Sequence, residues 1–157
     1  MTTSDNTAKT EAPAQQFAVQ RIYLKDLSFE APLGAQAFLE QLQPKVDQEL
    51  GTETKKVADD LYEMTLRLTI TAKTNDKTTF LVEVQQAGLF LMKGIDAASL
   101  TRVLNTVCPQ ILFPYAREAI DSALVKGSFP PLLLPPVNFE ALYDQALAEK
   151  QQKGAAH

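Results

Sequence analysis

The chain has 157 residues, of which 45% are hydrophobic and 22% are charged, and its formal net charge is −4. This length suits one domain with a real core and is too short for two. The negative charge, without a basic stripe, argues against nucleic-acid binding, and no apolar run is long enough to insert into a membrane.

The two ends of the chain differ in composition from the part between them. Residues 1–16 carry no hydrophobic periodicity and no signal-like apolar stretch, so we expect a disordered N-terminal tail. Residues 149–157 are expected to form a flexible C-terminal tail, which leaves one structured domain over residues 17–148. A single cysteine, Cys108, fits a reducing compartment, and we therefore expect the protein in the cytoplasm.

The first half of the chain carries strand patterns. Phe17–Glu30 reads as a strand whose apolar residues change parity, which predicts a bulge near Lys25. A short strand is expected at Lys45–Leu50. Strict alternation of apolar and polar residues over Leu61–Lys73 predicts a strand with one buried face, and Phe80–Phe90 continues it as an antiparallel hairpin.

The second half carries helical patterns. A helix is expected to begin at Asp96–Ser99 and to continue with apolar residues at three-four spacing as far as Leu124. Pro109 and Pro114 interrupt it, which predicts a kink or two abutting helices, and Gly127 is a candidate terminator. The apolar arc is wider than one sheet face can cover, which favours a subunit interface.

The segment Gly127–Phe139 combines four prolines with three leucines and two phenylalanines. Proline fixes φ and removes a backbone donor, so this segment cannot be the interior of a helix or of a central strand. It is expected to be a semi-rigid extended loop, which either covers the core or lines an apolar groove together with the last helix. That helix is expected from an Asn138 cap to about Leu147.

Residues suited to catalysis are scarce. The only histidine is the terminal His157, which argues against a Ser-His-Asp or Cys-His arrangement and, with one cysteine, against a metal site. Cys108 is better explained as a small buried hydrophobe than as a redox centre. Four polar side chains at helical spacing read as a solvated helix face before they read as an acid/base set: Tyr115, Arg117, Glu118 and Asp121. No enzyme activity and no cofactor are expected.

One face of the predicted sheet gathers acidic residues. Its members share the parity opposite to Leu27 and Phe29 and comprise Asp26, Ser28, Glu30, Glu63, Glu83 and Gln85, with Leu81 exposed among them. Such a face could dock a basic or zinc-carrying partner, or it could simply keep the protein in solution.

Four segments carry information beyond the spacing of apolar residues, because their residues can be compared directly with a known family: QRIYLKDLSFEAP, FLVEVQQAGLF, CPQILFPYARE and GSFPPLLLPPVNFEALY. In this order they resemble the SecB protein-export chaperones over about Phe17 to Tyr143. The resemblance implies an α+β fold, a four-stranded antiparallel sheet with two helices packed on one face. It also implies a homotetramer, assembled as a dimer of dimers, that holds unfolded precursor proteins in the cytoplasm and passes them to the motor SecA.

The resemblance also implies roles for individual residues. The SecA-docking residues of the family fall on Asp26, Glu30, Leu81 and Glu83, and positions tied to assembly and substrate retention fall on Val82, Val84 and Gln86. Because Gln48 stands where the family often has leucine, Val46 and Leu50 are expected to form the floor of a client-binding groove. The full groove set is Val46, Leu50, Phe113, Tyr115, Phe129, Leu132, Leu133, Leu134, Phe139 and Leu142.

Two other functions remain open. The chain could be a structural or adaptor oligomer whose apolar loop is its own interface. It could also be a SecB-like chaperone dedicated to one partner, such as a toxin–antitoxin system.

Overall fold

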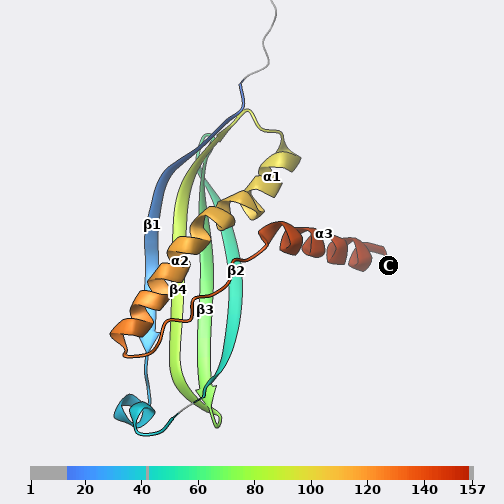
Figure 1. Ribbon diagram of the computed structural model, residues 1–157. Coiled ribbons are helices and arrows are strands. Elements are labelled where there is room, and N and C mark those ends of the chain that lie inside the picture. Colours follow the sequence, from blue (N-terminus) through green and yellow to red (C-terminus); the bar gives the residue numbers. More distant parts are fainter. Residues whose placement is uncertain (1–13, 42, 156–157) are drawn as a thin grey trace, which may run out of the picture.

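A four-stranded antiparallel sheet forms the body of the protein (Figure 1). The computed structural model describes residues 14–41 and 43–155. The strands are β1 (Gln16–Glu30), β2 (Lys45–Ala58), β3 (Leu61–Thr74) and β4 (Lys77–Lys93), in the order β1-β4-β3-β2. A short 3-10 helix, η1 (Gly34–Phe38), lies in the crossover between β1 and β2. The expected sheet and fold class are confirmed.

The bulge expected in β1 is present at Lys25. Leu24 pairs with Gln86 and Asp26 pairs with Gln85, so Lys25 is an extra residue without a partner in β4. The bulge lets the apolar residues on both sides of it face the same side of the sheet. We call that side the inner face, because helices cover it, and the opposite side the outer face.

Strand β2 is longer than the predicted Lys45–Leu50 and continues to Ala58. Its second half, from Thr52 onward, is exposed on both faces, so its residues show no alternation that a sequence pattern could reveal. Backbone pairing with β3 holds this half in the sheet: Thr52 lies opposite Leu66 and Lys56 opposite Tyr62. The prediction of a short strand was therefore wrong because β2 is an edge strand in which pairing, not burial, fixes the backbone.

Two abutting helices, α1 (Ala97–Asn105) and α2 (Val107–Lys126), are present, which confirms the second of the two predicted alternatives. The side chain of Asp96 caps α1 by accepting the N–H of Ser99 at 3.0 Å. The break lies at Thr106, not at a proline as expected. Pro109 lies in the first turn of α2, where its missing N–H costs no helical hydrogen bond, and Pro114 lies inside α2 without ending it.

Gly127 ends α2 as expected, but for another reason. Its φ is −84°, and the left-handed residue is Ser128, with φ of 62°. A Cβ added to Gly127 would lie 2.5 Å from Cζ of Phe29, so glycine is needed here because the Phe29 ring packs against the backbone.

The last helix, α3 (Phe139–Ala155), begins where predicted. Asn138 caps it by accepting the N–H of Ala141 at 3.0 Å. The helix continues well past Leu147, so residues 149–155 are helical, and the flexibility expected of this end stays a prediction. Residues 1–13 of the expected N-terminal tail lie outside the described residues, and β1 already begins at Gln16.

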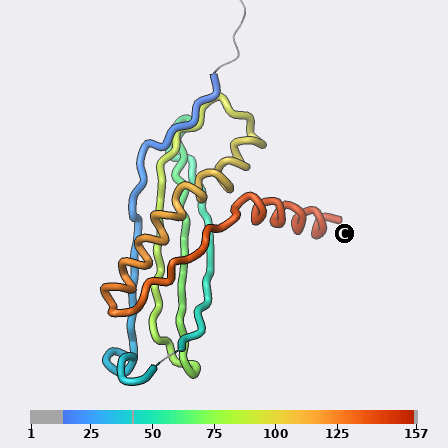
Figure 2. The backbone as a smooth tube through the Cα atoms, in the orientation of Figure 1, coloured from blue at the N-terminus to red at the C-terminus, as the bar shows by residue number. Residues whose placement is uncertain are grey.

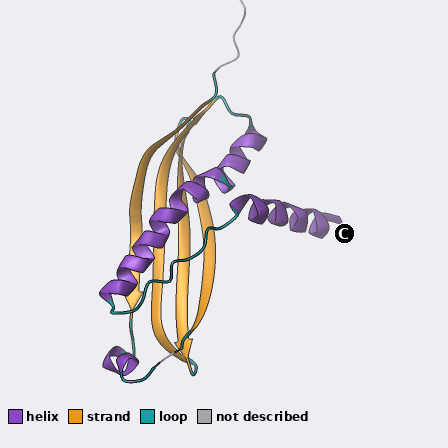
Figure 3. Ribbon diagram, viewed as in Figure 1, coloured by secondary structure: helices purple, strands orange, loops and turns teal. Residues whose placement is uncertain are grey.

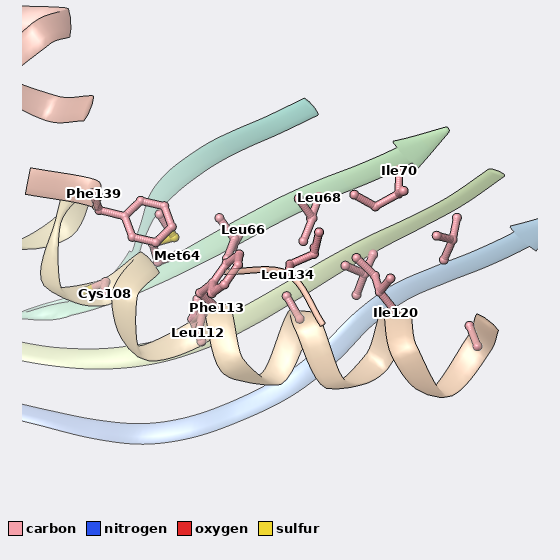
Figure 4. Packing of buried hydrophobic residues seen from close by; sticks show 14 of the residues in the cluster. Met64, Leu66, Leu68, Ile70, Cys108, Leu112, Phe113, Ile120, Leu134 and Phe139 are labelled. Atoms are coloured by element: carbon pink, nitrogen blue, oxygen red, sulfur yellow. The ribbon is translucent and has the colours of Figure 1, made fainter. Parts of the chain in front are cut away.

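Helix α2 crosses the inner face of the sheet, and the core lies between the two layers (Figures 3 and 4). Met64, Leu66, Leu68 and Ile70 of β3 are all fully buried there. Burial of each such side chain stabilises the fold by about 1.5–3 kcal/mol. The chain after α2 runs back beside that helix over the same face, and α3 then projects away beyond β2 (Figure 2).

Candidate functional site

The proline-leucine segment lies across the inner face as an extended strap, which we define as residues 128–138. Its backbone has no regular structure, and two side chains of α2 supply hydrogen-bond partners. Asp121 Oδ1 accepts the N–H groups of Leu132 at 2.9 Å and Leu133 at 3.4 Å. Arg117 donates to the carbonyl of Leu134 at 3.4 Å. The sequence suggested a solvated face for Arg117 and Asp121, but their structural role is to hold the strap.

One apolar pocket lies between the strap, η1 and the start of β4, and we call it the aromatic pocket. Its volume is about 330 Å³. The Phe129 ring packs in a tilted arrangement against Phe80 and Phe38, at 5.0 Å and 5.5 Å between ring centroids. The pocket is lined by Ala37, Phe38, Glu40, Pro44, Val46, Thr79, Phe80, Ser128, Phe129, Pro130 and Leu132.

A second pocket, which we call the helix pocket, lies between β2 and α3. Its volume is about 180 Å³. Apolar side chains of α3 form one wall, and backbone and side chains of β2 form the other. The lining residues are Leu50, Gly51, Thr52, Asn105, Phe139, Leu142, Tyr143 and Ala146.

The structure divides the groove predicted from the sequence between these two pockets and the core. Val46, Phe129 and Leu132 line the aromatic pocket, whereas Leu50, Phe139 and Leu142 line the helix pocket. Phe113 and Leu134 are buried in the core, at 4% and 8% exposure (Figure 4). Tyr115 and Leu133 are exposed but line neither pocket. The expected single groove is thus wrong in its geometry, and client binding by these residues stays a prediction.

Sequence reasoning missed Phe38 and Phe80 as pocket residues. Phe80 is 4% exposed and belongs to the core, yet it also lines the pocket. Phe38 is 56% exposed in the crossover between β1 and β2. A large aromatic side chain in a connection between strands was the available signal for it.

The outer face carries the acidic residues as expected. Glu30 pairs with Leu81, Ser28 with Glu83, and Asp26 with Gln85, so the side chains of Asp26, Glu30, Leu81 and Glu83 all lie on the side opposite α2. Thr69 donates a hydrogen bond of 3.2 Å to Glu83. The shared face is confirmed, and SecA docking on it stays a prediction.

Glu63 differs from the other outer-face carboxylates because its charge is already paired. Lys25 Nζ lies 2.9 Å from Glu63 Oε1, and the hydroxyl of Tyr23 donates to the other oxygen. The hydrogen bond from Tyr23, followed by that from Lys25, lowers the pKa of Glu63. Burial, with the bond to Glu63, raises the pKa of Tyr23 to about 12. Glu63 therefore braces β1 and β3 across β4 and adds little free charge to this face.

Val82, Val84 and Gln86 lie on the inner face of β4 and are buried; both valines are 0% exposed and Gln86 is 5% exposed. The two valines belong to the core under α2. Their expected part in assembly and substrate retention stays a prediction, and any such effect acts through packing and not through an exposed contact.

Cys108 is buried, and burial raises the pKa of its thiol to about 12. A thiol of this kind stays protonated at neutral pH, in keeping with the small buried hydrophobe expected at this position. Across residues 14–41 and 43–155, no helix has both the length and the hydropathy to cross a membrane.

Comparison with known proteins gives a consistent result. The family model described as preprotein translocase subunit SecB matches residues 10–150. The protein-export protein SecB of Cellvibrio japonicus is 53% identical over 93% of this chain and 87% of its own length. That of Hahella chejuensis is 54% identical over 93% of this chain and 92% of its own.

A solved structure shares the fold at lower sequence identity. The Mycobacterium tuberculosis SecB-like chaperone in complex with a ChAD peptide from the HigA1 antitoxin superimposes with a TM-score of 0.61. It is 19% identical, and the match covers 77% of this chain and 90% of that one. The extent and identity of the sequence matches place this chain in the SecB family of protein-export chaperones.

Proposed function

We propose that this protein is a holdase for protein export, which keeps precursor proteins unfolded in the cytoplasm and passes them to the SecA motor. The observation that carries the proposal is the pair of apolar pockets, one lined by the first half of the strap and the other by Phe139, the residue that follows the strap. A holdase needs apolar surface that unfolded chains reach and folded chains cannot, and it needs no catalytic residue. SecB is a chaperone family and not an enzyme family.

The two pockets suit an extended client chain. Val46 lines the aromatic pocket and Leu50 lines the helix pocket, both on β2. Four residues of extended strand span about 13 Å. A client segment that runs alongside β2 therefore places apolar side chains about four positions apart into the two pockets. Burial of each large apolar side chain contributes about 1.5–3 kcal/mol.

One copy of the chain should bind a client only weakly, because ordering each client residue costs about 1–2 kcal/mol. Several copies in one particle raise the effective concentration and add avidity of about 10²–10⁴ without new contacts. The energetics of the task thus favour an oligomer, and we propose the homotetramer, a dimer of dimers, that the family resemblance implies.

An apolar surface suited to self-association is present at β1. This strand is an edge of the sheet, and Val19, Leu24 and Leu27 on its inner face are 41%, 49% and 40% exposed. A shallow concavity lies between β1 and α2, lined by Leu24, Leu27, Phe29, Glu118, Ala119, Ser122, Ala123 and Lys126. A second copy is the natural occupant, because an exposed apolar edge strand pairs readily with another chain.

The outer face is the proposed docking surface for SecA. Glu30 pairs with Leu81, and Glu83 lies two residues farther along β4, on the way to the pair of Asp26 with Gln85. Asp47 and Glu49 of β2 extend the acidic surface on the same side. Acidic groups beside a partly exposed leucine attract a basic partner and give it an apolar contact. Because the pockets open on the inner side, a client and SecA do not compete for the same surface.

Suppression of aggregation tests the holdase proposal. A chemically denatured client is diluted into buffer with and without this protein, and light scattering is followed without nucleotide. A holdase suppresses scattering at a near-stoichiometric ratio. A structural or adaptor oligomer, which uses its apolar surface only for itself, leaves scattering unchanged.

A further inference from the structure

One arginine gathers nearly all the polar contacts of α3. Arg102, in α1, places Nη2 at 2.9 Å from Asp144 Oδ1 and Nη1 at 3.3 Å from Glu140 Oε2. Its Cζ lies 5.0 Å from the centre of the Tyr143 ring. The two carboxylates are four residues apart on one side of α3, so a single guanidinium bridges a full helical turn. The hydrogen bond with Asp144 is the main cause that raises the pKa of Arg102.

Little else holds α3 against the rest of the molecule. Phe139 is the only buried residue of Phe139–Ala155, and its ring packs edge-on against Phe113 at 6.1 Å between centroids. The remainder of the helix projects from the body (Figure 1). The placement of α3 therefore depends on one aromatic contact at its first residue and on the Arg102 cluster one turn later.

The position of α3 sets the size of the helix pocket. Phe139, Leu142, Tyr143 and Ala146 form its α3 wall, opposite Leu50 of β2. At about 180 Å³ the pocket is smaller than the ~300–1,000 Å³ usual for ligand sites. A bulky client side chain, with the backbone that carries it, needs more room than this wall leaves.

We propose that Arg102 is a positioning residue that latches α3 over the helix pocket, and that release of this latch lets α3 move away from β2 and admit a bulky client segment. The inference rests on the proposed holdase function. An exposed ion pair is weak, so the latch can open without unfolding the domain. Without Arg102, Glu140 and Asp144 repel each other across one turn and nothing polar retains the helix.

Arg102→Gln tests the latch, and Lys150→Gln is its matched control. Both remove one positive charge, but Lys150 is an exposed residue of α3 and forms none of the ion pairs found in the described ranges. Hydrogen exchange of the α3 amides is followed by mass spectrometry. Affinity is measured for a peptide with two phenylalanines four positions apart. Arg102→Gln should speed exchange in α3 and tighten peptide binding by about threefold to tenfold, and Lys150→Gln should do neither.

Salt gives an independent check on the same proteins. Raising the salt concentration from about 0.05 M to 0.5 M screens exposed charges, so it should speed α3 exchange in the unmodified protein. It should not speed exchange in Arg102→Gln, where the charges that remain in this cluster are the mutually repelling Glu140 and Asp144. If the α3 amides of Arg102→Gln exchange at the same rate as those of the unmodified protein, the proposed latch is wrong. If Arg102→Gln exchanges faster but binds the peptide more weakly, α3 is a fixed wall of the pocket, and the proposed opening of α3 is wrong. If the unmodified protein does not bind the peptide at all, the holdase proposal fails, while exchange still reports on the latch.

Discussion

The carboxylate of Asp121 accepts the backbone N–H of Leu132 at 2.9 Å, and this bond ties the strap to α2. The strap contains four prolines and no regular backbone pairing. Its first two N–H groups reach carbonyls at the end of α2, and farther along the side chain of Asp121 satisfies the N–H groups of Leu132 and Leu133. Leu132 also lines the aromatic pocket. The same hydrogen bond therefore connects the stability of the strap with the shape of the proposed client site.

Asp121→Ala should loosen the strap. Loss of the acceptor leaves the N–H of Leu132 without its partner, which should lower the free energy of unfolding by about 1–3 kcal/mol. Chemical denaturation measures this change, and hydrogen exchange should quicken at Leu132 and Leu133. Glu149→Ala, which removes an exposed carboxylate of α3, is the control and should change neither. Equal stability of the two variants would contradict the proposed role of Asp121.

The aromatic pocket should respond to Phe38 and not to Leu133. Phe38→Ser removes an aromatic wall that is 56% exposed, so the fold should survive while client affinity falls about tenfold, as expected for partial loss of one apolar contact. Leu133→Ser is the control, because Leu133 is 73% exposed but lines neither pocket. Isothermal calorimetry with an unfolded client gives both affinities. A larger loss for Leu133→Ser would restore Leu133 to the site and remove Phe38 from it.

Glu83→Lys should separate the two proposed surfaces. A reversed charge beside Leu81 should weaken SecA binding about tenfold or more and leave client affinity unchanged, because the pockets lie on the other side of the sheet. The control is Glu53→Lys, which makes the same charge change farther along the outer face, opposite Thr65. Equal losses of SecA affinity in the two variants would point to net charge instead of a local docking site. Equal losses of SecA and client binding would show that the surfaces are not separate.

The Glu63 brace predicts a pH dependence. A carboxylate whose pKa is lowered by folding stabilises the fold at pH values above its unfolded-state pKa, which is 4.5 here. That contribution is lost as the pH falls through the lower pKa of the folded state. Glu63→Gln should therefore lower Tm at pH 7, and the gap to the unmodified protein should narrow below about pH 4. Thermal melts across pH 3–8 measure this. A gap that stays constant with pH would contradict an ionised, hydrogen-bonded Glu63.

The periodicity of apolar residues correctly predicted the elements in which buried and exposed side chains alternate regularly. Leu61–Thr74 alternates because its inner face is the core, and the parity change around Lys25 marked a real bulge. The second half of β2 was missed because neither face is buried. A break between two helices was among the predicted alternatives, but its position at Thr106 was missed because proline inside the first turn of a helix is tolerated. These features depend on pairing and packing partners that a linear pattern does not contain.

The site was harder to predict than the fold. An apolar strap was evident from its composition, but which leucines face inward depends on how Arg117 and Asp121 hold its backbone. Leu134 turns into the core, and Leu133, with φ of 51°, turns out to solvent. The division into two pockets follows from that local geometry, which no residue spacing encodes.

Native mass spectrometry, with and without an unfolded polypeptide that has no stable fold of its own, tests the central claim most directly. The account predicts a tetramer of about 69 kDa, four copies of the 17.3 kDa chain, which gains the mass of the client. The gain should vanish when the same polypeptide is offered folded. An assembly whose mass is the same with and without unfolded polypeptide would contradict the account.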